Sequence, residues 1–254
     1  MKENGVPILS KTEIDVTGER FVRDFQSEVL ESPAPVDIEG FIEFYLGMTP
    51  DYQYLSHNGV YLWMTVFNDT NKVPVYDPVN HRADYISAKA RTVTIDNRLL
   101  GESQKHRYRF TLGHEGGHDI LHSGFFSYDP DQTSLFDSEV IAPMIQCRVE
   151  NTASDRRDTR RWNDRDWMEW QANHLSAAIL MPKTPIMQMA KHHGDKLKYP
   201  PSMGLFIAQI STIFDVSITA ATNRLKDLGI LRKDDSTNYS YGMDIMAFQE
   251  IARA

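Results

Sequence analysis

Two histidines four residues apart are the first feature of this sequence that could do chemistry. The segment reads His114-Glu115-Gly116-Gly117-His118. On a helix, residues four apart share one face, about 6 Å apart along the axis, so both imidazoles can converge on one ion. This spacing is typical of zinc peptidases, in which the adjacent glutamate is the general base. The motif therefore predicts a Zn²⁺ site with His114 and His118 as ligands and Glu115 as the catalytic base.

The two glycines inside the motif support this interpretation. Each costs about 1 kcal/mol of helix propensity relative to alanine. Gly116 and Gly117 therefore indicate that something packs very close to this helix, either a second motif helix or the substrate.

A catalytic zinc needs a third protein ligand besides an open position. Glu169 is the favoured candidate because the pattern around it is helical, and Asn173, four residues on, could support it from the same face. Other carboxylates lie between the two motifs on backbone expected to be irregular, which makes them less precise ligands. These competing candidates are Asp129, Asp131, Asp137, Glu139 and Glu150.

The two segments RFTLGHEGGHDILH and EWQANHLSAAILMP together resemble the ImmA/IrrE family of metallo-endopeptidases. The second segment carries the positions that match the family pattern: Glu169, Ala172, Asn173, Leu175, Ala178 and Leu180-Met181-Pro182. The resemblance is strong over 110–122 and 167–182 and weaker over 36–48 and 214–231. The sequence departs from the family in the fifty residues between His118 and Glu169, and in Leu175 and Ser176, where the family often has an aromatic residue and an alanine.

This resemblance implies a zincin-like core in which His114, His118 and Glu169 hold zinc. It also implies a protein substrate, a helix-turn-helix repressor of the Xre type, whose cleavage releases stress or mobile-element genes. The expected function is therefore a zinc-dependent endopeptidase. The alternative is a zinc-binding transcriptional regulator that does not cleave and acts by protein or DNA binding.

Several further side chains have open roles. An oxyanion formed during peptide hydrolysis needs a donor besides the metal, and His122, His174 and Tyr128 are candidates. Asp119 is either a second-shell anchor or a solvated helix residue, and the second reading is favoured. Cys147 could reach the open zinc position on a flexible loop and hold the enzyme inactive, although a packed, inert thiol is the favoured reading.

The elements that must position these residues follow from hydrophobic periodicity. Helices are expected over 18–31 and 37–47, around the first motif at 102–123, over 167–181, and as two short helices in 205–231 with Ser217 as an N-cap. Strands are expected over 60–67, 72–77 and 90–96. The fold class is therefore α+β, with a small mixed or antiparallel sheet, two motif helices and a C-terminal helical segment that resembles a helix-turn-helix.

Three parts are expected along the chain. Residues 1–17 read as a flexible lead-in, and residues 18–199 as the zinc metallopeptidase domain, with an insertion loop at 124–166. Residues 200–254 read as the C-terminal helical segment.

Composition limits the classes of partner. The 254 residues include one cysteine and carry a formal net charge of -8, and there is no apolar run long enough to span a membrane. A cytoplasmic protein without membrane contact is expected. Direct DNA binding is not expected, because the second C-terminal helix offers only Arg224 and Lys226 beside Asp227. The arginine run at 156–165 is interleaved with aspartates and reads as a solvated loop.

Overall fold

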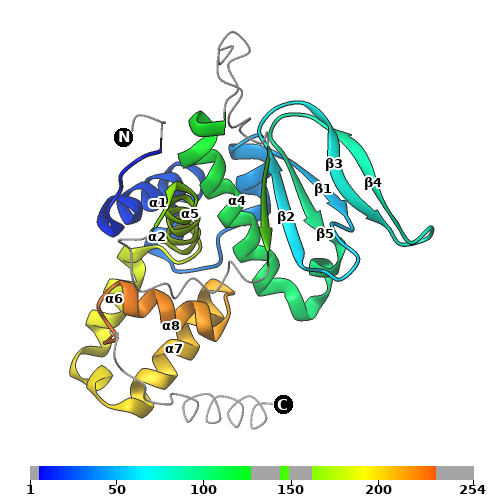
Figure 1. The fold of residues 1–254 in the computed structure, drawn as a ribbon. Helices are drawn as coiled ribbons and strands as arrows, with labels where there is room; N and C mark the ends of the chain where they lie inside the picture. The colour runs from blue at the N-terminus through cyan, green and yellow to red at the C-terminus, as the bar shows by residue number, and fades with distance from the viewer. Residues whose placement is uncertain (1–5, 127–143, 149–161, 233–254) are drawn as a thin grey trace. The chain divides into compact units, whose positions relative to one another are not determined.

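The computed structural model describes residues 6–126, 144–148 and 162–232 (Figure 1). The chain forms two compact units. One comprises residues 1–9 and 38–176, and the other comprises residues 10–37 and 177–254. These units are defined by packing, so they do not test the domain boundaries expected at 17/18 and 199/200. Those boundaries stay a prediction.

A mixed sheet forms the centre of the first unit. Its strands are β1 (Thr49–Gln53), β5 (Thr92–Asp96), β2 (Tyr61–Val66) and β6 (Met144–Arg148), in that spatial order. β1 runs parallel to β5, whereas β2 is antiparallel to both β5 and β6. The α+β class and the mixed sheet are therefore confirmed.

The strands β3 (Thr70–Asp77) and β4 (Arg82–Ala88) form a separate antiparallel hairpin. The sequence correctly predicted β2, β3 and β5 but missed β1, β4 and β6. β1 contains Pro50 and Asp51, which disfavour strands on their own, and β4 is largely exposed and lacks a buried alternating face. The expectation of irregular backbone throughout 124–165 is wrong at β6, which forms by pairing with β2.

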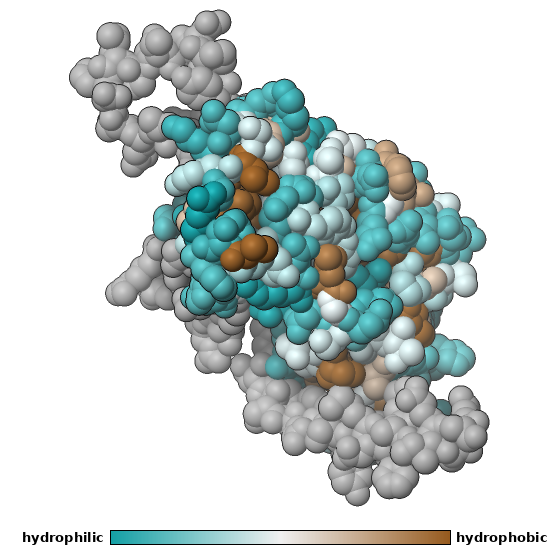
Figure 2. Space-filling view, turned by 90° about the vertical axis from the view of Figure 1, so that its right-hand side faces the viewer, coloured by the Kyte–Doolittle hydropathy of each residue, from teal (hydrophilic) through white to brown (hydrophobic). Residues whose placement is uncertain are grey.

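Side chains alternate along a strand, so the two faces of β2 contact different neighbours. Met64 and Val66 pack with Leu55, Val73 and Val75 in a small core beside the hairpin. Seen from the hairpin side in Figure 2, apolar residues lie scattered among hydrophilic ones, and the hairpin exposes Val79 and Tyr85. The opposite face of β2 points toward the helix that carries the first motif.

That helix is α4 (Lys105–Phe126), which follows two short 3₁₀ turns, η2 (Asn97–Leu100) and η3 (Glu102–Gln104). The second motif lies on α5 (Asp164–Leu180). The two helices meet backbone to backbone, because a Cβ on Gly117 would lie 3.1 Å from both Cα and O of Ala172. The expectation that a second motif helix packs against the motif glycines is confirmed at Gly117.

Gly116 faces another neighbour. A Cβ there would lie 2.7 Å from Cδ1 of Ile42. Ile42 belongs to the turn of π-helix η1 (Phe41–Tyr45), which continues the short helix α3 (Ile38–Gly40). The paired glycines thus let α4 approach two different elements.

Gly117→Ala is expected to destabilise the protein by about 1–3 kcal/mol, because overpacking displaces rigid backbone rather than a mobile side chain. The matched control is Gly124→Ala on the same helix, where a Cβ would have nothing within 4 Å. There the higher helix propensity of alanine should leave the stability unchanged or raise it by up to about 1 kcal/mol. Urea unfolding of both variants checks this, and equal stabilities would contradict the close approach.

The second unit contains α1 (Lys11–Gln26), α2 (Glu28–Glu31), α6 (Lys183–His193), the 3₁₀ turn η6 (Gly194–Lys198), α7 (Pro200–Phe214) and α8 (Ile218–Asp227). α1 begins earlier than the expected start at residue 18. Ser10 and Glu13 form a capping box, in which Glu13 N donates to Ser10 Oγ and Ser10 N donates to Glu13 Oε2.

The C-terminal pair α7 and α8 agrees with the expected pattern. Ser217 caps α8 by accepting a hydrogen bond from Ala220 N, and Gly229 follows the helix with φ 73°. Ala221 and Leu225 are fully buried, so they are core positions as expected. Among the described residues no single helix is long and apolar enough to cross a membrane; α7 and α8 together meet that test only as a pair bent by 110°.

Arg224 of α8 is a buried structural residue. Only 3% of it is exposed, its Nη1 lies 2.6 Å from Asp15 Oδ1, and its Nε donates to the carbonyl oxygen of Met181. Its guanidinium is therefore committed to interactions inside the second unit.

Candidate metal centre

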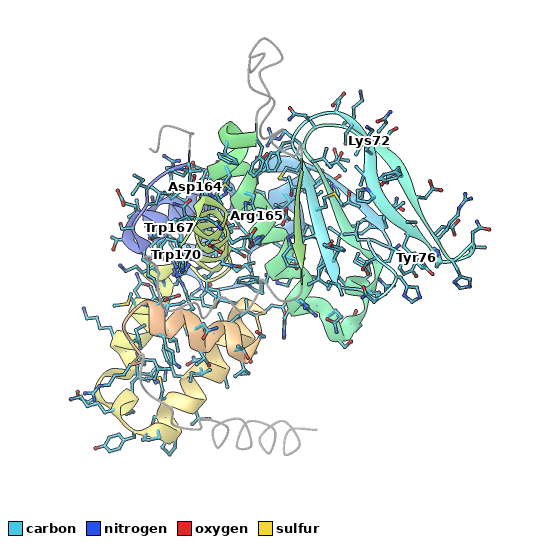
Figure 3. The ribbon with its side chains drawn as sticks, in the orientation of Figure 1. Lys72, Tyr76, Asp164, Arg165, Trp167 and Trp170 are labelled. Carbon is cyan, nitrogen blue, oxygen red and sulfur yellow. The ribbon has the colours of Figure 1, made fainter. Side chains whose placement is uncertain are left out.

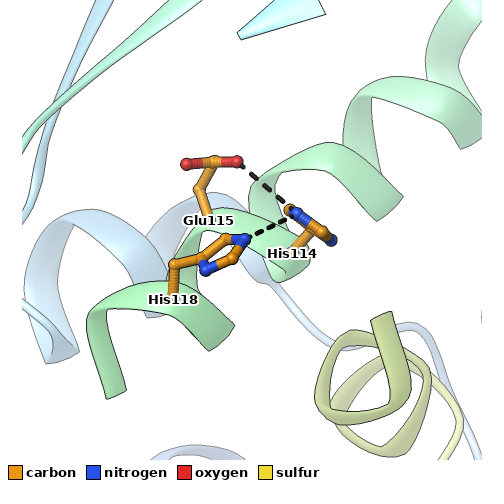
Figure 4. Close-up of side chains that lie close together, drawn as sticks. All are labelled: His114, Glu115 and His118. Carbon is orange, nitrogen blue, oxygen red and sulfur yellow. Dashed lines mark hydrogen bonds and ion pairs between the residues drawn. The ribbon is translucent and has the colours of Figure 1, made fainter. Parts of the chain in front are cut away.

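The ionisable side chains of the first motif lie on α4 and are buried. His114, Glu115 and His118 are 1%, 0% and 0% exposed. The two imidazoles converge as the spacing predicted, with their Nε2 atoms 2.9 Å apart (Figure 4). These three residues form a cluster of donor atoms that could hold a metal ion.

Glu169 of α5 faces the same two nitrogens. Its Oε2 lies 3.4 Å from His114 Nε2, and its Oε1 lies 3.6 Å from His118 Nε2. Tetrahedral zinc with bonds near 2.0–2.1 Å places its donors about 3.3 Å apart. The three donor separations lie around this value, so His114, His118 and Glu169 fit one ion.

Glu115 is placed differently from Glu169. Its Oε1 lies 3.9 Å from His114 Nε2, and its Oε2 accepts a hydrogen bond from Thr65 Oγ1 on β2. Burial raises the pKa of Glu115 to about 7. A carboxyl group that changes protonation near neutral pH, beside a metal cluster but held from another element, suits a proton carrier better than a ligand.

Burial and neighbouring charged groups shift the pKa values of the two histidines in opposite directions. Burial, with His114 and His122 nearby, lowers the pKa of His118 well below its ordinary value. Burial opposes protonation of His114 too, but the Glu169 carboxylate outweighs it and raises its pKa. His114 Nδ1 lies 3.0 Å from Asn173 Oδ1, which can only accept, so this nitrogen donates and Nε2 is the metal-facing atom. Asn173 thus contacts His114, while its expected support of Glu169 stays a prediction.

The structure corrects two further assignments. His122 is fully buried, and both its nitrogens are engaged, Nδ1 with His118 Nδ1 at 3.0 Å and Nε2 with Gln171 Oε1 at 2.9 Å. It therefore has no atom left to stabilise an oxyanion. Asp119 is not a solvated residue, since it is 9% exposed and its Oδ2 lies 2.7 Å from Arg91 Nη2.

His174 belongs to an aromatic cluster on α5. Its ring centroid lies 4.3 Å from that of Trp170, and its Nδ1 lies 2.8 Å from the Trp170 carbonyl oxygen. Trp170 in turn packs edge-on against Trp167, and both lie on α5 (Figure 3). The ring centroid of Trp162 lies 4.8 Å from that of Trp167 and 6.2 Å from that of Trp170. His174 is thus held by tryptophans, and the oxyanion donor stays open.

Several residues singled out in the sequence lie outside the described part of the chain. They are Tyr128, the competing ligands Asp129, Asp131, Asp137, Glu139 and Glu150, and the arginines at 156, 157, 160 and 161. The backbone of Cys147 is described and lies in β6 opposite Trp63, so the expected flexible loop is replaced by a strand at this point. The inhibitory role of Cys147 stays a prediction.

Three supporting residues were missed in the sequence. Thr65 holds Glu115, Trp63 packs edge-on against His114 with ring centroids 5.5 Å apart, and Gln171 contacts His122. Of the three, only Thr65 could have been predicted from the sequence. It is a polar residue inside the apolar strand YLWMTV, where a buried hydroxyl needs a hydrogen-bond partner. Nothing in the sequence distinguished Trp63 from a core residue.

Comparison with known proteins adds an independent observation. Residues 145–226 match the profile of the IrrE N-terminal-like domain, Peptidase_M78. The chain carries a Peptidase_M78 domain. Peptidase_M78 is a metallopeptidase family, and the predicted resemblance to ImmA/IrrE proteins is confirmed. No curated protein matches the chain.

The matched residues contain the second motif but not the first. Glu169 and Asn173 lie within the Peptidase_M78 match, whereas the HEGGH segment precedes it. The fold brings the two motifs together, since Glu169 lies within 3.6 Å of both motif histidines. The candidate donor residues therefore come from a segment inside the match and a segment outside it.

Proposed function

We propose that this protein is a zinc-dependent endopeptidase with a zincin-like core, and that it cleaves a helix-turn-helix repressor of the Xre type in the cytoplasm. The observation that carries the peptidase proposal is the triangle of His114, His118 and Glu169 donors beside the separately held Glu115. His114, His118 and Glu169 are the proposed Zn²⁺ ligands, and Glu115 is the proposed general base.

The roles of the protein groups follow from their placement. Bound zinc supplies Lewis-acid polarisation of the scissile carbonyl and makes a water molecule more acidic. Glu115 takes a proton from the attacking water and delivers it to the leaving amine. The Thr65 hydroxyl fixes one carboxylate oxygen, while Glu115 Oε1 has no hydrogen-bond partner among the described residues and can accept that proton.

A protein substrate rather than DNA is supported by the C-terminal helices. The side chain of Arg224, one of the two basic groups on the would-be recognition helix α8, is buried against Asp15. A reading helix needs exposed groups that reach bases and phosphates. The repressor as substrate rests on the family resemblance alone.

The test is incubation of the purified protein, loaded with zinc, with a helix-turn-helix repressor encoded beside its gene. We expect two repressor fragments by mass spectrometry, and none after the metal is removed with a chelator. An unfolded protein such as casein serves as a second substrate. Cleavage of casein but not of the repressor would contradict the proposed substrate, and cleavage of neither by zinc-loaded protein would favour the non-cleaving regulator.

A further inference from the structure

A chain of hydrogen bonds runs from the N-terminal segment to the metal cluster. Gln171 Nε2 donates to the carbonyl oxygen of Pro7 at 2.7 Å, and Gln171 Oε1 lies 2.9 Å from His122 Nε2. His122 Nδ1 lies 3.0 Å from His118 Nδ1. His118, His122 and Gln171 are at most 1% exposed, so no solvent competes for these groups.

The direction of every bond in this chain follows from its first member. A carbonyl oxygen can only accept, so Pro7 fixes which end of the Gln171 amide is the NH₂ group. The amide oxygen then accepts from His122 Nε2–H. A neutral imidazole has one N–H, so His122 Nδ1 accepts, and His118 Nδ1 must donate to it.

We propose that the N-terminal segment, through Gln171 and His122, positions His118 by fixing the tautomer whose Nε2 lone pair faces the metal. Gln171 and His122 are therefore positioning residues for the proposed zinc ligand set. The inference rests on the proposed metal site, but the tautomer can be measured without any metal.

The opposite arrangement would disable the ligand. If the Gln171 amide turned over, its NH₂ group would donate to His122 Nε2, and His122 Nδ1–H would donate to His118 Nδ1. His118 would then carry its proton on Nε2, 2.9 Å from His114 Nε2, where a metal needs a lone pair. The Pro7 carbonyl excludes this arrangement.

The N-terminal segment is held in place by its own packing. Val6 is fully buried and packs with Phe126 of α4 and Met168 of α5, beside Phe67 and Phe125. Ile8, two residues on, is 68% exposed. Residues 6–8 thus lie within the part of the chain expected to be a flexible lead-in, yet their packing holds the Pro7 carbonyl against Gln171.

The first experiment is ¹⁵N NMR of the imidazole rings in the zinc-free full chain near neutral pH, where protonated His114 can donate from Nε2 to His118 Nε2. We expect His118 to carry its proton on Nδ1 and His122 to carry its proton on Nε2. The reverse pattern at either ring would overturn the proposal, whatever the activity of the protein.

The second experiment measures zinc affinity by competition with a chromophoric chelator. Gln171→Met removes the acceptor for His122 and should weaken zinc binding about 10- to 100-fold, as other outer-shell losses do. Unchanged zinc affinity in Gln171→Met would overturn the proposal.

The third experiment combines the two ends of the chain. Val6→Asp should displace the segment and weaken zinc binding when residue 171 is glutamine, whereas Ile8→Asp, the exposed control, should not. With Gln171→Met present, Val6→Asp should cause no further loss of zinc affinity, because the chain of hydrogen bonds is already broken. An equal loss in both backgrounds would mean that Val6 acts through stability alone, and the proposal would be overturned.

Discussion

Replacement of Glu169 by glutamine is expected to remove stoichiometric zinc from the purified protein. The carboxylate lies 3.4 and 3.6 Å from the two histidine nitrogens and supplies the third donor and its negative charge. A neutral amide is a weaker zinc donor and carries no negative charge. Zinc affinity should therefore fall by more than the roughly 10- to 100-fold typical of an outer-shell change. Zinc content after desalting and the dissociation constant from chelator competition are the measurements.

The control for Glu169→Gln is Asp166→Asn, three residues earlier on α5. Asp166 accepts a hydrogen bond from Asn163 N at the start of the helix. This variant should retain full zinc. If Glu169→Gln kept full zinc and activity, the third ligand would be Glu115 or one of the carboxylates between the motifs, such as Asp129.

Local patterns correctly predicted that His114, His118 and Glu169 lie close together, while their roles stay a prediction. The four-residue spacing of His114 and His118 depends only on helix geometry. The motif glycines indicated close packing partners, of which α5 is the partner at Gly117. Glu169 was favoured because a helix positions a carboxylate better than irregular backbone does. All three donors indeed come from helices.

Supporting contacts were harder to predict because they join elements that are distant in sequence. His122 looked like a substrate-facing histidine until Gln171, 49 residues later, was found to occupy its Nε2. Asp119 looked solvated because its partner, Arg91, lies in the turn before β5. Hydrophobic periodicity shows which residues share a face of a helix or strand. It does not show which distant residue packs against that face.

The boundaries of helices and strands could likewise be predicted where their signal is local, but not where they depend on a distant pairing partner. The Ser217 cap was found because its signal is local. The start of α1 was missed although Ser10 and Glu13 form a local signature as well, so that error was avoidable. β6 could not have been found from periodicity, because its five residues become a strand only by pairing with β2.

Replacement of Glu115 by glutamine is expected to leave zinc bound and to lower kcat/KM for repressor cleavage about 10²- to 10⁴-fold, the range that proton transfer by a positioned side chain contributes. Glutamine has nearly the same shape, and its amide oxygen can still accept from Thr65 Oγ1. The amide cannot take up the proton of the attacking water. Cleavage rates and zinc content must be measured on the same preparation.

The two glutamate variants together decide which carboxylate is the ligand. Glu115 Oε1 lies 3.9 Å from His114 Nε2, farther than either Glu169 oxygen from its nearest histidine, yet Glu115 still belongs to a cluster that could bind metal. Loss of zinc in Glu115→Gln with full zinc in Glu169→Gln would exchange the two roles. Zinc retained without cleavage in Glu115→Gln, and zinc lost in Glu169→Gln, is the result that the geometry of α4, α5 and β2 predicts, because only Glu115 is held by Thr65 from outside the donor triangle.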